Sequence, residues 1–464
     1  MMSIDWKAEV EKRQDEYLED LFTLLRVNSV RDDEHASEEE PVGPGPRKAL
    51  DTFLEIAERD GFITKNVDNL AGRVEFGEGD ETLGILGHVD VVPVDKYWET
   101  DPFEPVVKDG NLYARGASDD KGPTMAAYYA LKIIRDLDLP LKKKVHFIVG
   151  TDEESGWMCM DRYFKTEPMP NLGFSPDATF PIINGEKGQY TVYLDFTDRD
   201  ETLVQFTAGQ RENMVPAEAK AQLKGVALAD LKAEAQAYND EEPVEITLEE
   251  SDGMVLVQAK GKAAHGSNPQ HGENAATHLA RFLLKGVPAL KENKFLRFQA
   301  EKLHGDYFGK ETGVDHHDDV MGDLTLNPGV IHWLEGHPQI VINMRVPRGI
   351  SYGDIGEKFD SLGETYGFKR TDSDGNRDPH YVSGDDPLVK TLLAAYEDQT
   401  GEKGYEQVIG GGTYGRLFER GVAYGAMFPD TPDTMHQANE YARLDDLFTA
   451  MAIYADAIYR LISE

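Results

Sequence analysis

Residues 82–92 read TLGILGHVDVV, and residues 145–151 read VHFIVGT. Both are short apolar runs with the length of a buried strand. A segment with helical spacing, Gly116 to about Leu137, lies between them, and another helix is expected near residues 46–60. Alternation of strands and helices predicts an α/β fold whose site lies at the carboxyl ends of the strands.

The pattern changes in the middle of the chain. Stretches such as QYTVYLDF, MVLVQAKGKAAHG and QIVINMRVP alternate apolar and polar residues, as antiparallel strands do, and a helix is expected over residues 274–286. The α/β pattern then returns. We therefore predict a discontinuous α/β domain with a central mixed sheet, residues 1–186 and 381–464, and an inserted α+β domain, residues 187–380.

Composition limits the classes of partner. The chain has 464 residues, with 48 Lys+Arg and 85 Asp+Glu, a net charge of −37 and a pI near 4.7. Such a charge repels nucleic acids and anionic membranes, so neither is an expected partner. Cys159 is the single cysteine, which excludes a disulfide within the chain and a cysteine-built zinc site. Residues 5–28 have the spacing of an amphipathic helix without an apolar signal core, so a cytoplasmic protein is expected.

Five polar motifs border the predicted strands and helices. They are Gly87-His88-Val89-Asp90, Ser118-Asp119-Asp120-Lys121-Gly122, Asp152-Glu153-Glu154-Ser155-Gly156, Ser175-Pro176-Asp177 and Met435-His436-Gln437-Ala438-Asn439-Glu440. Each motif alone has a structural explanation, such as a core histidine or a helix N-cap. Together they supply two imidazoles and at least three carboxylates, which suits two Zn²⁺ or Mn²⁺ ions that activate a water for hydrolysis.

The order of these motifs resembles a known family. GHVDVVP, YARGASDDKGP, GTDEESGW, SPDATFP and MHQANE occur as they do in the aminoacylase/glutamate-carboxypeptidase family of dinuclear zinc hydrolases, and AKGKAAHGSNPQHGENA resembles the lid motif of that family. The length, the long insert and GGGTYGR resemble the bacterial dipeptidase-V branch, that of Xaa-His and carnosinase-like dipeptidases. The resemblance implies a catalytic metal-binding domain and an inserted lid domain.

The resemblance also implies roles for particular residues. The implied metal ligands are His88, Asp119, Glu154, Asp177 and His436. Asp119 would bridge the two ions, with His88 and Asp177 on one and Glu154 and His436 on the other. Asp90 would orient His88, and Glu153 would be the general base.

In the insert, His265 matches the lid histidine that stabilises the carbonyl oxyanion. The residues expected to contact substrate are Asn213, Arg345, Gly411, Gly412 and Thr413. A turn asparagine, a surface ion pair and a plain glycine turn are the alternative interpretations of these substrate positions.

The implied function is that of a metallopeptidase, a metal-dependent dipeptidase that hydrolyses dipeptides with a free amino terminus through a water activated by two metal ions and a glutamate base. In the family, aspartate at position 177 accompanies substrates with a free amino terminus. The alternatives are an N-acyl-amino-acid deacylase or carboxypeptidase of the same family, and a non-catalytic protein that binds metal or peptide. Two Zn²⁺ ions are expected, with Mn²⁺ or Co²⁺ as alternatives. The long insert favours a monomer over a homodimer.

Overall fold

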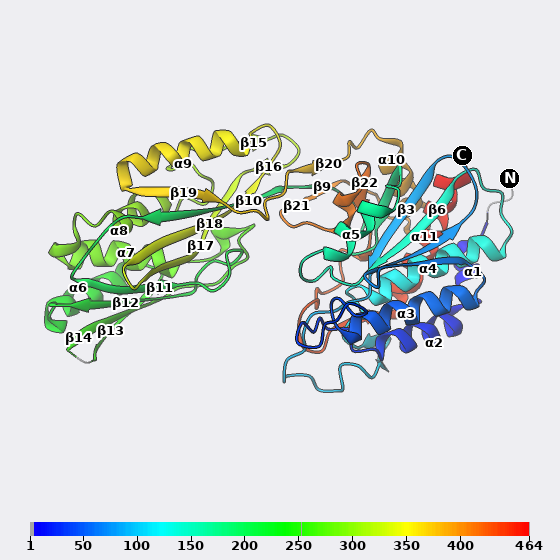
Figure 1. The fold of residues 1–464 in the computed structure, drawn as a ribbon, viewed down its shortest axis with the longest axis horizontal. Coiled ribbons are helices and arrows are strands. Elements are labelled where there is room, and N and C mark those ends of the chain that lie inside the picture. The colour runs from blue at the N-terminus through cyan, green and yellow to red at the C-terminus, as the bar shows by residue number, and fades with distance from the viewer. Residues whose placement is uncertain (1–3, 252, 464) are drawn as a thin grey trace. The chain divides into compact units, whose positions relative to one another are not determined.

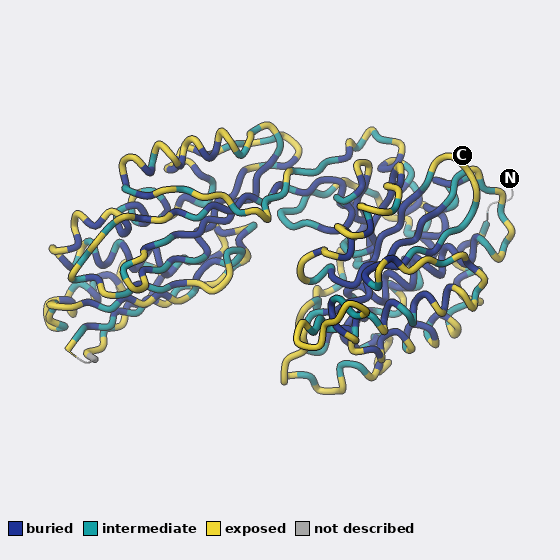
Figure 2. The backbone as a smooth tube through the Cα atoms, viewed as in Figure 1, coloured by how far each residue is buried: buried dark blue, intermediate teal, exposed yellow. Residues whose placement is uncertain are grey.

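The computed structural model describes residues 4–251 and 253–463. The chain forms two compact units. Unit 1 comprises Met1–Gly185, Tyr381–Gln407 and Gly412–Glu464, and unit 2 comprises Glu186–His380 and Val408–Gly411. Each unit has its own hydrophobic core, visible as buried strands and helices in Figure 2.

Unit 1 is built on a mixed sheet (Figure 1). In spatial order its strands are β1 (Ile63–Val67), β2 (Ala71–Phe76), β6 (Lys144–Gly150), β3 (Thr82–His88), β7 (Leu172–Ser175), β22 (Gly421–Ala423), β9 (Ile183–Glu186) and β20 (His380–Tyr381), and β21 (Gln407–Ile409) pairs with β9. The four strands β6, β3, β7 and β22 are parallel to one another, whereas β1, β2 and β9 pair antiparallel. The predicted α/β class with a central mixed sheet is confirmed.

Helices cover both faces of this sheet. They are α1 (Trp6–Glu11), α2 (Gln14–Leu25), α3 (Pro44–Arg59), α4 (Lys121–Asp136), α5 (Met158–Thr166), α10 (Pro387–Thr400), α11 (Leu444–Ser463) and the short 3₁₀ helix η4 (Tyr414–Leu417). Helices α3, α4 and α11 contribute to the core on one face, and α5 and η4 to the core on the other. Strands β3 and β6 are therefore buried along nearly their whole length, which explains their continuous apolar sequences.

Two predicted helices have different bounds in the structure. The helix expected over residues 5–28 is broken between α1 and α2, because Arg13 leaves the helical conformation and its guanidinium donates to the carbonyl oxygen of Glu9 (3.0 Å). The helix expected from Gly116 begins only at Lys121. The amides that precede it donate to a distant carboxylate described below, so they do not continue the helix.

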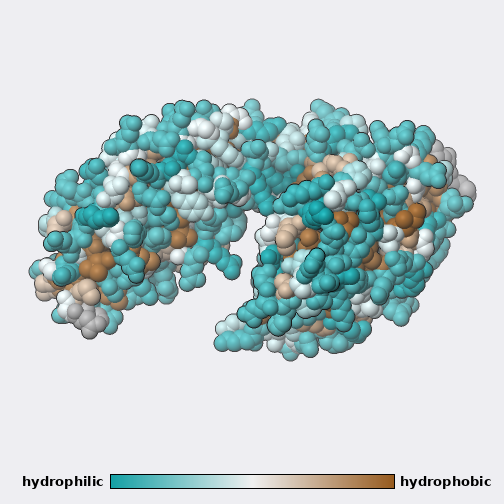
Figure 3. Space-filling view, viewed as in Figure 1, coloured by the Kyte–Doolittle hydropathy of each residue, from teal (hydrophilic) through white to brown (hydrophobic). Residues whose placement is uncertain are grey.

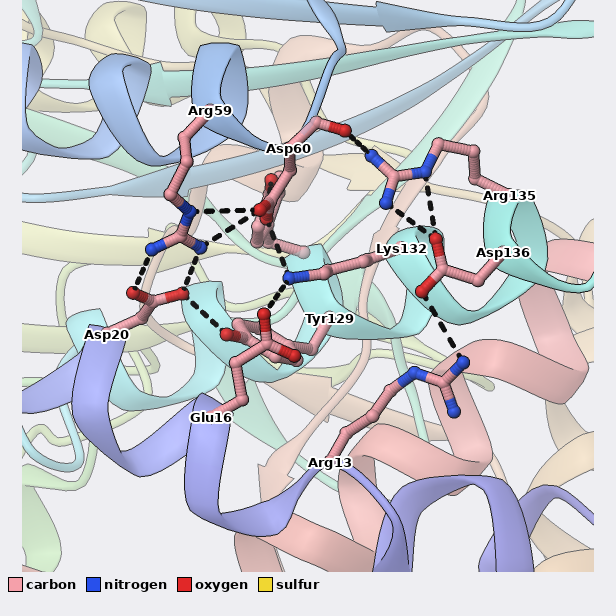
Figure 4. Close-up of polar contacts among 10 residues, drawn as sticks. Arg13, Glu16, Asp20, Arg59, Asp60, Tyr129, Lys132, Arg135 and Asp136 are labelled. Atoms are coloured by element: carbon pink, nitrogen blue, oxygen red, sulfur yellow. Dashed lines mark hydrogen bonds and ion pairs between the residues drawn. The ribbon is translucent and has the colours of Figure 1, made fainter.

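A network of ion pairs joins α2, α3 and α4 (Figure 4). Both terminal nitrogens of Arg59 donate to the buried carboxylate of Asp20, each at 2.7 Å. Lys132, which is also buried, donates to Glu16 (2.6 Å) and lies 2.9 Å from Asp60. Each buried charge is paired with an opposite charge, so the helix layer encloses these groups without an unpaired ion.

Small sheets of short strands complete unit 1. The first is a three-stranded sheet, in which β5 (Asn111–Tyr113) lies between β4 (Val106–Lys108) and β24 (Tyr441–Arg443). The second is the pair of β8 (Ala178–Thr179) and β23 (Ala426–Met427). Cys159 is buried beside the hydroxyl of Tyr414, with its sulfur 3.0 Å from that oxygen. Free cysteines are commonly packed in this way as small apolar residues.

Unit 2 is an antiparallel sheet with helices on one face (Figure 1). In spatial order its strands are β13 (Glu245–Ser251), β14 (Met254–Lys260), β12 (Glu218–Lys224), β11 (Leu203–Ala208), β17 (Thr325–Leu334), β18 (His337–Val346), β10 (Gly188–Phe196) and β19 (Phe368–Asp372). Alternate residues of β12 and β14 are buried, as expected for a sheet with one covered face.

Side chains cap several helices of unit 2 at their N-termini. The α-helices are α6 (Leu228–Glu241), α7 (Ala275–Gly286), α8 (Lys294–Phe298) and α9 (Tyr352–Tyr366). The other elements outside the sheet are η1 (Pro269–His271), η2 (Pro288–Leu290), η3 (Gln299–Leu303), β15 (His317–Asp318) and β16 (Gly322–Asp323). The side chain of Asn274 accepts hydrogen bonds at the start of α7, and Ser351 and Asp354 form a capping box at the start of α9.

The visible surface agrees with the acidic composition. Hydrophilic residues cover most of both units on the face drawn in Figure 3. Among the described residues, no helix is long and apolar enough to cross a membrane.

Candidate metal centre

The five polar motifs lie in unit 1, four of them close to its parallel strands. His88 is the last residue of β3, and Glu153 and Glu154 follow β6. Asp177 follows β7, and Asp119 precedes α4. Strands β3, β6 and β7 are parallel, so their carboxyl ends meet at one edge of the sheet, where an α/β fold places its site.

The structure brings the five predicted ligands together. The two carboxylate oxygens of Asp119 contact different histidines, Oδ1 at 3.1 Å from Nε2 of His88 and Oδ2 at 2.9 Å from Nε2 of His436. Asp177 Oδ2 lies 3.6 Å from the same nitrogen of His88. Glu154 Oε2 lies 3.0 Å from the same nitrogen of His436. Asp119 therefore stands between two groups of ligand atoms, the geometry that a bridging carboxylate requires.

Asp90 contacts both the ring of His88 and the backbone of Glu154. The Nδ1 atom of His88 lies 3.1 Å from the backbone carbonyl of Asp90 and 3.4 Å from its carboxylate. The other carboxylate oxygen of Asp90 accepts a hydrogen bond from the backbone N–H of Glu154 (3.1 Å). Asp90 thus orients the His88 ring through its main chain and also positions the loop after β6, a contact that the sequence did not predict.

Asp120 takes a structural position beside the cluster. It stands at the N-cap of α4, but its carboxylate accepts hydrogen bonds from the Thr124 hydroxyl (2.6 Å) and from the backbone N–H of His88 (3.2 Å) rather than from the helix amides. Of the adjacent pair of aspartates, Asp119 faces the histidines and Asp120 supports the strand end.

The electrostatics of the cluster require positive charge. Burial, followed by the negative charge of Asp177, raises the pKa of Glu153 well above its ordinary value. Burial and Asp119 raise the pKa of Glu154 to about 7. The hydrogen bonds that His436 donates to the carboxylates of Asp119 and Glu154 raise the pKa of its imidazole to about 11. In the protein alone, protons and the imidazolium charge therefore offset the mutual repulsion of the carboxylates. A bound divalent cation would offset the same repulsion with its greater positive charge.

The residues present fit such cations. Ligand atoms of His88, Glu153 and Asp177 lie within 4.8 Å of one another, as do those of His88, Asp119 and Glu154. A buried oxygen of Glu154 and one of Asp90 have no hydrogen-bond partner within the protein. Imidazole nitrogens with carboxylate oxygens form a donor set that suits Zn²⁺, Mn²⁺ or Co²⁺.

The predicted lid residues gather within unit 2. The carbonyl oxygen of Asn213 accepts a hydrogen bond from Gly266 (2.7 Å), next to His265. A Cβ atom at Gly410 would lie 2.6 Å from the side chain of Ser267 and 3.6 Å from Cγ of Arg345, so only glycine fits there. Asn213, His265, Arg345 and Gly410 thus belong to one local arrangement.

The predicted glycine loop is divided between the units. Gly411 belongs to unit 2, whereas Gly412 and Thr413 belong to unit 1. Thr413 is buried, and its hydroxyl accepts a hydrogen bond from the backbone of Gly415 (3.1 Å), which caps η4. This contact gives Thr413 a structural role in unit 1.

His265 has a defined tautomer. Its Nδ1 atom accepts a hydrogen bond from the backbone N–H of Ser267 (3.2 Å). The same atom lies 2.7 Å from the hydroxyl of Ser267. Partial desolvation by its neighbours, followed by the positive charge of Arg345, lowers the pKa of His265. The ring is therefore neutral at pH 7, and the proton assigned by these contacts is on Nε2, which leaves that nitrogen as a hydrogen-bond donor.

Sequence reasoning missed two supporting residues. Arg31 donates to the buried carboxylate of Asp152 (2.7 Å), the residue before Glu153. Glu440, the last residue of the MHQANE motif, accepts hydrogen bonds from the loop that carries Asp119. Its position four residues after His436 indicated that Glu440 lies near the predicted ligands. Local spacing does not, however, reveal its contacts with a loop far away in the sequence.

A cluster of imidazoles and carboxylates at the carboxyl edge of an α/β sheet, buried at His88 and Asp119 and exposed at His436, is the site of a metal-dependent hydrolase. The chain belongs to the peptidase family M20/M25/M40, whose family model matches residues 84–460.

Similarity to individual proteins extends over nearly the whole chain. A Staphylococcus aureus protein (strain bovine RF122 / ET3-1) named "Putative dipeptidase" is 45% identical over 468 aligned residues, which cover 99% of this chain and 100% of that protein. The solved structure of human carnosine dipeptidase 1 is similar in fold, with a TM-score of 0.56 and 17% identity over 97% of both chains. The aminoacylhistidine dipeptidase of Vibrio alginolyticus has a TM-score of 0.55 and 15% identity, over 96% of this chain and 97% of that one.

Proposed function

We propose that the protein is a dipeptidase of the dipeptidase-V branch that uses two divalent ions, Zn²⁺ first among them, to hydrolyse dipeptides with a free amino terminus. The observation that carries the proposal is the cluster in which Asp119 contacts both His88 and His436 while Glu153 lies beside it. The name of the staphylococcal relative and its full-length identity support the dipeptidase activity.

In this proposal the cluster holds two ions. His88 and Asp177 would bind one, Glu154 and His436 the other, and Asp119 both. When bound, the ions would supply the positive charge that polarises a peptide carbonyl and makes a water molecule acidic.

Glu153 would move the proton. Its carboxylate lies close enough to His88 and Asp177 to reach the same space, with ligand atoms within 4.8 Å of one another. As general base it would accept a proton from the attacking water and donate it to the amine that leaves. Ionised Glu153 is required for the first step, and nearby positive charge would favour that state.

Residues of unit 2, together with Gly412 of unit 1, would recognise the substrate. The Nε2–H group of neutral His265 would donate to the carbonyl oxygen as negative charge develops there. Arg345, with Asn213 and the loop at Gly411 and Gly412, would hold the terminal carboxylate, since a guanidinium binds a carboxylate with two parallel hydrogen bonds. We propose a monomer rather than a homodimer, because the insert is long enough to supply these groups from the same chain.

The first experiment compares three substrates. Metal-loaded protein, with a chelator-treated control, is assayed with Leu-Leu, β-Ala-His and N-acetyl-Leu-Leu. Chelator-sensitive cleavage of only the free dipeptides is expected. Preference for the acetylated peptide would instead support the deacylase or carboxypeptidase alternative, and a stoichiometric complex without cleavage would support a binding protein.

A further inference from the structure

Glu440 is a fully buried carboxylate outside the predicted ligand set. One of its oxygens accepts hydrogen bonds from three backbone N–H groups, those of Gly116 (3.1 Å), Ser118 (2.9 Å) and Asp119 (3.1 Å). Three converging donors bind an ionised carboxylate more strongly than a neutral acceptor. The conformation of the loop before α4 therefore depends on Glu440.

Arg115 completes the charge balance around this carboxylate. Its guanidinium donates to the second oxygen of Glu440 at 2.7 Å, and both side chains are almost wholly buried. Arg115 also lies over the ring of Trp98, at 5.2 Å from its centre, and donates to the carbonyl of Pro93 at 3.4 Å. The pair thus links three segments. Arg115 belongs to the loop before α4, Glu440 to the segment after His436, and Arg115 also contacts the segment after Asp90.

This pair determines where two ligand-bearing segments meet. Glu440 lies four residues after His436 and holds the backbone N–H of Asp119, whose side chain lies 2.9 Å from His436. Strand β24 follows Glu440 directly and pairs with β5, which precedes Arg115, so that Tyr441 lies opposite Tyr113. A shift of either segment would therefore change the separation between Asp119 and His436.

We propose that Glu440 and Arg115 are positioning residues of the metal centre, which hold the bridging carboxylate of Asp119 at the correct distance from His436. This inference rests on the proposed metal centre but not on the identity of the peptide substrate. The chemistry requires a charged carboxylate, because the side chain must accept from three amides at one oxygen and from a guanidinium at the other.

Glu440→Gln is the informative substitution. Glutamine has nearly the same volume, but its NH₂ group must face either Arg115 or the three amides, and both are donors. The matched control is Glu419→Gln, an exposed carboxylate in the same C-terminal part of the chain. Arg115→Lys is a second variant, which keeps the charge but loses the planar donor geometry.

The experiment measures Zn²⁺ and Co²⁺ binding to purified full-length protein by competition with a chromophoric chelator, together with the absorption spectrum of the Co²⁺ form. Circular dichroism and thermal melting identify the folded fraction. We expect folded Glu440→Gln to bind one of the two ions about 10–100-fold more weakly, as loss of residues that orient ligands typically does. At limiting Co²⁺ its spectrum should become that of a single occupied site, and Arg115→Lys should show a smaller change in the same direction.

The outcomes are separable. If folded Glu440→Gln binds both ions with wild-type affinity and gives the wild-type Co²⁺ spectrum, the positioning role is wrong, even if the melting temperature falls. If wild-type protein binds no divalent ion, the metal centre fails and this inference fails with it. Metal binding by the wild type without dipeptide cleavage would contradict the proposed function and leave the comparison of variants valid.

Discussion

Glu153→Gln tests the general-base role, because it removes a carboxylate while nearly preserving the size of the side chain. Glu153 shares a space with His88 and Asp177 in which ligand atoms lie within 4.8 Å of one another. Loss of a general base costs roughly 10²–10⁴ in rate. At about 1.4 kcal/mol per factor of ten, the barrier rises by about 3–5.5 kcal/mol. We expect kcat to fall within this range while KM changes little.

The assay needs two measurements on the same preparation. Metal content is determined after dialysis, and the initial rate of Leu-Leu hydrolysis is determined at saturating metal. Glu154→Gln is the matched control, since Glu154 contacts His436 at 3.0 Å and is a proposed ligand. We expect Glu153→Gln to keep both ions and lose turnover, and Glu154→Gln to lose metal as well.

Two results would refute the reasoning. Turnover above a few per cent of the wild-type rate in Glu153→Gln would remove Glu153 from proton transfer. Loss of metal from the same variant would make Glu153 a ligand, an arrangement that its distances to His88 and Asp177 also allow.

Other predictions concern metal binding and stability. Asp119→Ala should lose both ions, because Asp119 contacts both histidines of the cluster, and full occupancy measured by elemental analysis would contradict a bridging role. Lys132→Met should lower the free energy of unfolding by about 2–3 kcal/mol, less than the 3–5 kcal/mol typical of a broken buried pair because Asp60 keeps another cation. Lys12→Met, at an exposed pair, should change it by less than about 1 kcal/mol in the same denaturation assay, and equal losses would contradict the network. Burial and nearby Arg73 lower the pKa of His146 from 6.5 to about 4, so the folded state binds fewer protons and its stability is lost as pH falls from 6.5 towards 4. Between about pH 7.5 and pH 5 this loss amounts to about 2 kcal/mol. Urea denaturation of His146→Gln should lack that part of the pH dependence, and identical pH profiles would exclude it.

The sequence predicted the parts of the fold that depend on local pattern. Continuous apolar runs indicated β3 and β6, and helical spacing indicated α3 and α7, within a few residues of their observed bounds. The break between α1 and α2 was missed because both sides keep the same helical spacing. The side chain of Arg13 ends the first helix, and periodicity does not reveal such a contact.

The candidate site also has a part that the sequence predicted and a part that it did not. The motifs predicted which side chains could bind metal, and the structure places those of His88, Asp119 and His436 in contact. The sequence did not predict the supporting contacts of Glu440, because the partners of that residue lie more than 300 positions earlier in the chain. Contacts of that separation depend on the complete tertiary fold.

The discontinuity of unit 1 has a consequence for biosynthesis. Strand β22 pairs with β7 inside the sheet, and α11 packs on α4, yet both are translated after all of unit 2. Until they leave the ribosome, one edge of β7 lacks its neighbour, and such apolar strand edges promote aggregation. His436 also arrives late, so its contact with Asp119 can form only after unit 2 has been made. Slow translation of the segment that carries β22 and α11 would lengthen the time for which the nascent sheet depends on chaperones.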